Sequence, residues 1–97
     1  MKNKPSKNYP LNGIKVLELA RVLAGPWVGQ LLSDLGAEVI KIESPNGDET
    51  RDWGPPFLED KYSTYFKGAN RGKMSFMADF KNKSDLDYVK KLSKKAD

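Results

Sequence analysis

The chain of 97 residues contains no cysteine and no histidine. It can therefore form neither a disulfide nor a thiol nucleophile, and it lacks the side chain that most often acts as a general base near neutral pH. No apolar run approaches the ~20 residues that a membrane span requires, and none follows the basic N-terminus as it would in a secretory signal. We expect a soluble, cytoplasmic protein without membrane contact or a metal site, in which carboxylates, lysines or tyrosines carry any chemistry.

The charge balance is mildly basic, with 17 Lys and Arg against 13 Asp and Glu and a formal net charge of +4. This excess suits a phosphate-bearing ligand, but it is too weak and too scattered to predict nucleic-acid binding. The apolar content of 38% allows a modest core, enough for one small domain or for a piece of a larger one.

Two short strands are predicted in the first half of the chain. Residues 14–19 are rich in β-formers without strict alternation, which is typical of a strand covered on both faces, and residues 37–42 form a second apolar run. A strand, a helix and a strand within roughly 30 residues make a right-handed βαβ unit. The predicted fold class is α/β, with this Rossmann-like unit starting a parallel sheet.

The helix between these strands is predicted over residues 26–35. Gly25 can serve as its N-cap, Pro26 suits its first position and Gly36 suits a left-handed C-terminal cap. One side of the helix is an apolar stripe made by Val28, Leu31, Leu32 and Leu35.

The second half is predicted to begin with a long loop over residues 44–60. A short helical turn over 62–66 and a turn over 70–73 then lead into a third strand over 74–80. Ser84 is predicted to open a last helix through a capping box that ends at Asp87. The apolar side of that helix comprises Leu86, Val89, Leu92 and Ala96.

The sheet predicted from these elements is incomplete. A parallel sheet is normally covered on both faces, and about two helices are too few to cover three strands. We expect residues 1–10 to be a mobile N-terminal arm and residues 11–97 to be a segment of a larger domain. Trp53 and Phe57 in the long loop suggest surface that a second subunit or the rest of the domain covers, although local packing would explain them equally well.

Three constellations are candidates for binding. The turn over residues 22–26 places backbone N–H groups at the end of a parallel strand, where anions bind, although every connection from strand to helix has such a turn. Glu43 ends the second strand where a nicotinamide-binding fold keeps its ribose-binding acid, but the glycine fingerprint is missing. The cations of residues 70–73, with Lys81, could meet phosphates or could simply be solvated.

Three stretches of the sequence carry a family resemblance: LNGIKVLELARVLAGPWVGQLLSDLGAEVIKIESPNGDETR, NRGKMSFMADFK and LSKKAD. In this order they resemble the amino-terminal part of the class III coenzyme A transferases, which include formyl-CoA and carnitine-CoA transferases and have α-methylacyl-CoA racemase as a close relative. The resemblance runs from Leu11 to Asp97.

The resemblance implies a large Rossmann-like domain and a small domain in a much longer chain, with two such chains interlocked as a homodimer. It implies acyl-CoA and a carboxylic acid as substrates, with CoA as a substrate and no permanently bound cofactor. In the transferases an aspartate attacks the thioester to form a mixed anhydride. That aspartate, like the base pair of the racemase, lies downstream of the matched region, so no catalytic residue is expected here. A racemase segment, a non-catalytic CoA-binding fragment and, more distantly, a nicotinamide enzyme remain alternatives.

The resemblance also assigns CoA contacts. The matching positions are the turn at Leu23 and Ala24, the position after Glu43, and residues 78–81. Leu23 replaces a glutamine of formyl-CoA transferase, which disfavours oxalate and formate as substrates, and Ser44 replaces an arginine, which leaves the phosphates to lysine or arginine elsewhere. The expected CoA site is therefore Leu23, Ala24, Ser44, Arg71, Lys73, Ala78, Asp79, Phe80 and Lys81.

Overall fold

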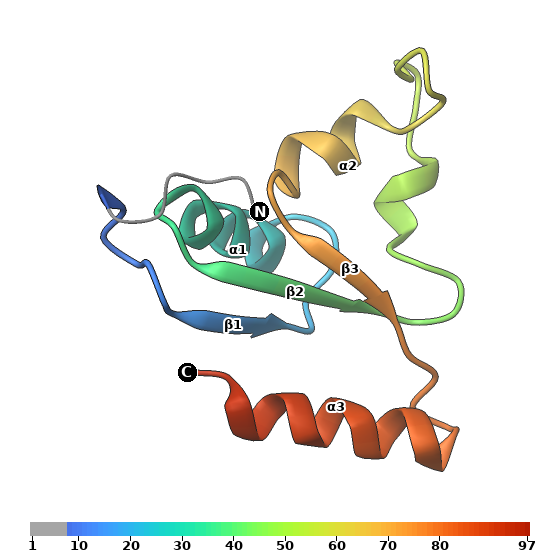
Figure 1. Cartoon of the computed structure of the whole chain (residues 1–97). Coiled ribbons are helices and arrows are strands. Elements are labelled where there is room, and N and C mark those ends of the chain that lie inside the picture. The colour runs from blue at the N-terminus through green and yellow to red at the C-terminus, as the bar shows by residue number, and fades with distance from the viewer. Residues whose placement is uncertain (1–7) are drawn as a thin grey trace.

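The computed structural model describes residues 8–97. Its strands β1 (Lys15–Glu18), β2 (Glu38–Glu43) and β3 (Met74–Met77) form one sheet in the order β1-β2-β3, and neighbouring strands run parallel. The predicted α/β fold is confirmed (Figure 1). The expected N-terminal arm lies mostly outside the described residues.

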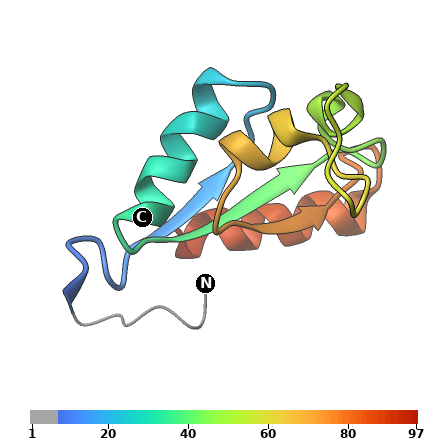
Figure 2. The same cartoon turned by 90° about the horizontal axis from the view of Figure 1, so that it is seen from above.

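Helices lie on both faces of the sheet. Helix α1 (Ala24–Asp34) connects β1 to β2 across one face, and α3 (Lys83–Lys95) runs along the other, as Figures 1 and 2 show. The apolar core lies between the sheet and α3. It consists of Ile42, Ala78 and Val89, with Leu17, Ile40 and Leu92 packed against them.

Helix α1 begins earlier than predicted, so Gly25 is not its N-cap. The first helical hydrogen bond runs from Trp27 N to Leu23 O at 2.8 Å, and no side chain caps the helix. Pro26 is tolerated because its missing N–H falls among the donors that the first turn leaves free. Gly25 instead allows close packing, because a Cβ at this position would overlap the Ala20 side chain. Gly36 has a φ of +108° and ends the helix as predicted.

Most of the apolar stripe of α1 points away from the sheet, and of its four residues only Leu32 is half-buried. Trp27, Val28 and Leu31 are 57–59% exposed, whereas the buried face comprises Pro26, Gly29, Gln30 and Ser33. The physical reason is the sheet surface beneath, which carries charged side chains near the ends of β1 and β2. Small and polar residues pack closely against such a surface, and large apolar ones do not.

The connection from β2 to β3 contains more structure than predicted. A 3₁₀ helix η2 (Glu49–Asp52) lies within the expected loop, and the helical turn expected over 62–66 is helix α2 (Thr64–Ala69), which Ser63 caps. The turn over 70–73 is confirmed, with Gly72 at a φ of +78°.

Strand β3 and helix α3 also differ from their predicted bounds. β3 ends at Met77 because Asp79 turns the chain: its side chain accepts from Lys81 N at 2.9 Å. The predicted capping box at Ser84 is wrong, since Asn82 caps α3 by accepting from Asp85 N at 3.1 Å. The apolar side of α3 does pack on the sheet, through Val89 and Leu92.

Trp53 and Phe57 are both partly exposed. The Trp53 ring meets Tyr65 edge-on at 5.0 Å between centroids, and Phe57 packs against Gly54. Local packing thus covers part of each ring, and coverage of the remainder by another surface stays a prediction.

Candidate functional site

A pocket of about 530 Å³ opens at the carboxyl ends of the three strands. Each wall comes from the segment that follows one strand, because parallel strands deliver all their carboxyl ends to the same edge of the sheet. The lining residues are Leu19, Ala20, Arg21, Lys41, Ile42, Glu43, Ser44, Pro45, Asn46, Gly47, Asp48, Ala78, Asp79, Phe80 and Lys81.

The structure brings together five of the residues predicted to contact CoA. Ser44 lies after β2, and Ala78, Asp79, Phe80 and Lys81 follow the neighbouring strand β3. Phe80 and Lys81 are exposed, so an aromatic ring and an ammonium group lie at the mouth of the pocket. These groups suit stacking of a base and contact with a phosphate. Leu23 and Ala24 begin α1 next to this site but do not line the pocket itself.

Lys73 and Arg71 are placed elsewhere. Lys73 Nζ is buried, lies 2.7 Å from Glu18 Oε1, and donates to Pro26 O, Ala69 O and Asn70 Oδ1 at 2.7–3.2 Å. Burial lowers the pKa of Lys73 although Glu18 partly offsets this effect. Arg71 pairs with Asp34 on the surface at 2.7 Å. Neither cation lines the pocket, and each is engaged in an ion pair with a carboxylate.

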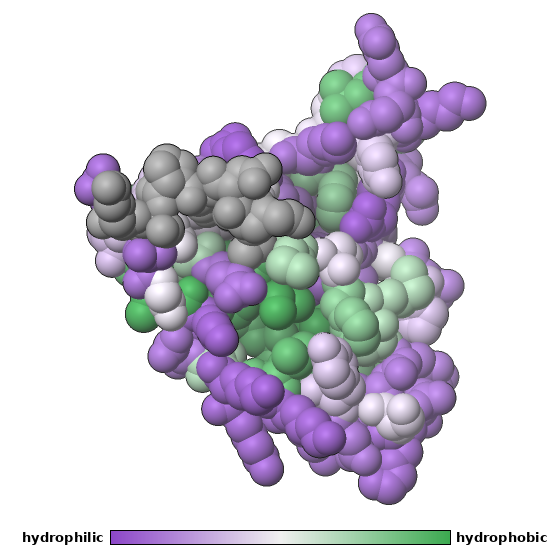
Figure 3. Space-filling model, viewed as in Figure 1, coloured by the Kyte–Doolittle hydropathy of each residue, from purple (hydrophilic) through white to green (hydrophobic). Residues whose placement is uncertain are grey.

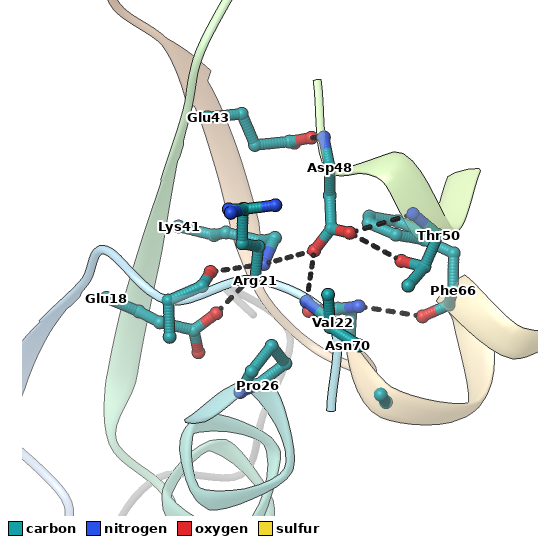
Figure 4. A network of polar contacts seen from close by, with 12 residues as sticks. Glu18, Arg21, Val22, Pro26, Lys41, Glu43, Asp48, Thr50, Phe66 and Asn70 are labelled. Carbon is teal, nitrogen blue, oxygen red and sulfur yellow. Dashed lines mark hydrogen bonds and ion pairs between the residues drawn. The ribbon is translucent and has the colours of Figure 1, made fainter. Parts of the chain in front are cut away.

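A buried network of charges lies behind the pocket (Figure 4). Lys41 Nζ donates to Glu18 Oε2 at 3.1 Å and lies 3.0 Å from Asp48 Oδ2, with all three side chains at most 5% exposed. Three cations face three carboxylates, which leaves the network without net charge. Its members are Glu18, Lys41, Glu43, Asp48, Arg51 and Lys73.

Glu43 is fully engaged within this network. Its carboxylate accepts from Arg51 Nε at 2.8 Å, from Asp48 N at 2.7 Å and from Ser75 Oγ. Burial works to raise the pKa of Glu43, but the hydrogen bonds from Arg51, Ser75 and Asp48 outweigh it and lower the pKa to about 2. Glu43 therefore presents no free carboxylate to a ribose, which removes the support for a nicotinamide site.

Asp48 is the most enclosed of the network's carboxylates. Its Oδ1 accepts from Thr50 N at 2.9 Å and from Thr50 Oγ1 at 2.7 Å, and its Oδ2 accepts from Val22 N at 3.3 Å. Burial works to raise the pKa of Asp48, but the bonds from Thr50 and the proximity of Lys41 hold it below its ordinary value.

Sequence reasoning missed this network. A signal was present, because Glu18 and Lys41 are charged positions within strands predicted to be covered on both faces. A charge in such a strand must be paired when it is buried. The partner Asp48 lies in a loop, and no local pattern links it to the strands.

Neither a metal cluster nor a membrane span is found in the described part of the chain. Residues 8–97 contain no group of three or more acidic side chains placed to hold a metal ion. Among the same residues, no helix has the length and apolar character needed to cross a bilayer.

Three comparisons with known proteins bear on this site. The model of CoA-transferase family III matches residues 11–97. Succinate–glutarate CoA-transferase of Agrobacterium fabrum is 50% identical over 103 residues, covering 100% of this chain and 26% of that protein. Succinyl-CoA:glutarate CoA-transferase of Mus musculus is 51% identical over 85 residues, covering 87% of this chain and 19% of that protein.

A solved structure agrees with these matches. The crystal structure of a CaiB/BaiF family protein from Brucella suis superposes with a TM-score of 0.88 at 55% identity, covering 94% of this chain and 25% of that one. The chain belongs to CoA-transferase family III and spans about a fifth to a quarter of the length of these relatives.

Proposed function

We propose, from the membership of CoA-transferase family III, that this chain is the CoA-binding N-terminal segment of an enzyme that moves CoA between an acyl-CoA and a carboxylic acid. The observation that carries the proposal is the pocket at the strand ends. It joins Ser44 on one wall to residues 78–81 on the other, and both were assigned to CoA from the sequence alone.

The substrates that we propose are short dicarboxylic acids and their CoA thioesters. The relatives from Agrobacterium fabrum and Mus musculus are named for succinate and glutarate, and a further relative from Haloarcula hispanica, 42% identical, is named for succinyl-CoA and mesaconate. Because these relatives are transferases, we favour transfer over racemisation.

The chemistry requires a carboxylate that attacks the thioester carbonyl to form an aspartyl-acyl anhydride and release CoA thiolate. We assign that carboxylate to sequence outside this chain. Of the carboxylates that line the pocket, Glu43 and Asp48 are buried and engaged in ion pairs, and a nucleophile must reach its substrate. The third, Asp79, accepts a hydrogen bond from Lys81 N in the turn after β3. The interlocked homodimer of the longer protein belongs to the same proposal.

Calorimetric titration with CoA tests the binding half of the proposal. We expect a dissociation constant near millimolar, because this chain alone supplies only some of the walls of the CoA site. Lys81→Ala should weaken binding several-fold, whereas Lys90→Ala, an exposed lysine on α3, should leave it unchanged. Equal effects of the two changes would contradict the assignment of Lys81.

Acyl exchange followed by mass spectrometry tests the chemical half. We expect the chain alone to exchange no CoA between succinyl-CoA and glutarate above the buffer rate. Exchange above that rate, lost on changing one of Asp34, Asp52 or Asp79 to Asn, would show that the nucleophile lies within this chain.

A further inference from the structure

We propose that Asp48 is a positioning residue whose buried carboxylate holds the turn between β1 and α1 in the conformation that presents Leu23 and Ala24 to the ligand. The inference rests on the proposed CoA site, because those two residues belong to it. Asp48 is among the residues that line the pocket, but its side chain is 0% exposed, so its carboxylate does not contact the ligand.

The turn contains a residue in an unfavourable backbone conformation. Val22 has a φ of +74°, in the left-handed region that β-branched residues rarely adopt. Such a conformation persists only where the surrounding structure enforces it, and it is found preferentially at ligand-binding and catalytic sites. Leu23 and Ala24 follow directly, so the direction of the Val22 backbone sets where they lie.

Two buried side chains, Asp48 and Lys41, form hydrogen bonds with the backbone of this turn; Figure 4 shows the bond from Val22 to Asp48. Asp48 Oδ2 accepts from Val22 N at 3.3 Å, and Lys41 Nζ donates to Ala20 O at 2.9 Å. Because Lys41 Nζ also lies 3.0 Å from Asp48 Oδ2, an ion pair joins the two side chains that form these hydrogen bonds. The turn is thus fixed at two points, one on each side of Arg21.

Asp48 is rigid enough to act as an anchor. Its second oxygen accepts two hydrogen bonds from Thr50, and its backbone N–H donates to Glu43 Oε1 at 2.7 Å. The side chain therefore cannot follow the turn if the turn moves. Asp48 also belongs to the loop that forms one pocket wall, so it couples that wall to the start of α1.

The packing of the turn leaves little room for an alternative path. A Cβ at Gly25 would overlap the Ala20 side chain, so the first turn of α1 lies directly against the end of β1. If the hydrogen bond from Val22 N to Asp48 is lost, we expect residues 20–24 to move together, so that Leu23 and Ala24 change position.

A role confined to balancing the charge of Lys41 predicts different behaviour from a positioning role. If Asp48 enforces the left-handed conformation of Val22, glycine at position 22 should make that enforcement unnecessary, because glycine adopts a positive φ freely. If Asp48 only balances charge, Asp48→Ala should weaken CoA binding by the same factor whether valine or glycine stands at position 22.

The experiment is a double-mutant cycle on CoA affinity with Asp48→Ala, Val22→Gly and the double variant. We expect Asp48→Ala to weaken CoA binding about tenfold (about 1.4 kcal/mol) and the double variant to weaken it by less than about threefold. Asp48→Asn, which keeps an oxygen acceptor for Val22 N–H, should fall between. Leu92→Ala, a change in α3 near the amino ends of β1 and β2, controls for destabilisation alone and should not change the affinity of the folded protein.

A double variant whose loss equals the product of the two single losses overturns the proposal. If the unchanged chain binds no CoA, the proposed function fails but the positioning role is still tested, because the same cycle can be read from the amide chemical shifts of Leu23 and Ala24.

A measurement on the unchanged protein covers the case in which Asp48→Ala does not fold. The amide proton of Val22 should exchange slowly with solvent, because it is hydrogen-bonded to the buried carboxylate of Asp48. The backbone couplings of Val22 should be those of a positive φ. Exchange at the rate of an open loop would overturn the proposal.

Discussion

Lys41 places its ammonium group within the middle strand of the sheet, and the side chain is 1% exposed. Removing such a charge from water is costly, and the cost is offset only where partners are close and well oriented. Lys41 has three: the carboxylates of Glu18 and Asp48 and the carbonyl of Ala20. The network therefore depends on this one lysine, which joins β2 to the end of β1 and to the loop of the pocket wall.

Lys41→Met should destabilise the chain by about 3–5 kcal/mol, because it leaves the buried carboxylate of Asp48 without its cation and Glu18 with Lys73 as its remaining partner. Lys67→Met is the matched control: Lys67 pairs with Asp60, but both side chains are 47–48% exposed, so its loss should cost at most about 1 kcal/mol. Urea unfolding at neutral pH measures both. Equal losses would show that the buried network contributes no more than a surface pair.

Glu43→Gln should remove part of the acid sensitivity of the fold. The pKa of Glu43 is lowered from 4.5 to about 2, so the stability that its ionised form contributes is present above pH 4.5 and is lost as the pH falls toward 2. At neutral pH the contribution is about 3 kcal/mol as an order of magnitude.

Urea unfolding from pH 7 to pH 2 tests this change. We expect the curves of the parent and of Glu43→Gln to differ at pH 7 and to converge near pH 2, while Glu59→Gln, which alters an exposed carboxylate, follows the parent throughout. A constant difference at every pH would contradict the assigned protonation behaviour.

At the scale of elements, α1 packs through its smallest residues. Gly29 lies over Glu18, and a Cβ at Gly29 would overlap Glu18 Oε1 and come within 3.2 Å of the Lys73 side chain. Gly72, in the turn before β3, faces Ser33 in the same way. Through these close approaches, α1 lies directly against Glu18 of the charged network and against the turn that precedes β3.

Gly29→Ala should therefore destabilise the chain by about 1–3 kcal/mol through overpacking. Gly68→Ala provides the opposite case within α2, since a Cβ there would meet nothing within 4 Å, and it should stabilise the chain by about 0.5–1 kcal/mol. Thermal or urea unfolding separates the two. The same sign for both changes would refute the packing described for α1.

The elements also show what sequence reasoning can reach. The βαβ unit, the parallel sheet and the apolar side of α3 follow from local periodicity and were predicted. The orientation of α1 was not predicted, because it depends on what the sheet presents to the helix. Val28 and Leu31 of the apolar stripe are exposed, and small and polar residues of α1 lie over the charged end of β1. In the candidate site, Ser44 and Lys81 were found through resemblance, whereas Asp48 acts through contacts distant in the sequence.

At the scale of the whole molecule, apolar surface remains uncovered. The outer face of α1 exposes Trp27, Val28 and Leu31, and β3 exposes Met74 and Met77. Figure 3 shows apolar side chains gathered over the strands on one face of the molecule. Exposed patches of this kind mark surfaces that another part of a protein covers, and this chain spans about a quarter of the length of its relatives.

The chain alone should therefore bind the dye ANS and associate with itself at high concentration. Changing Val28 and Leu31 together to Gln should reduce both effects and alter the free energy of unfolding by at most about 0.5 kcal/mol, because the two side chains lie outside the core. Dye fluorescence and sedimentation measure the outcome. A strictly monomeric chain that binds no dye would contradict the description of α1.

Binding of CoA in the pocket at the carboxyl ends of the strands is tested by titrating the isotope-labelled chain with CoA and following its backbone amide signals. We expect shifts concentrated at Ser44, at residues 78–81 and at Leu23 and Ala24, with little change along α3 beyond its first turn. Shifts centred on Arg71 and Lys73, or no shifts at CoA concentrations of several millimolar, would contradict it.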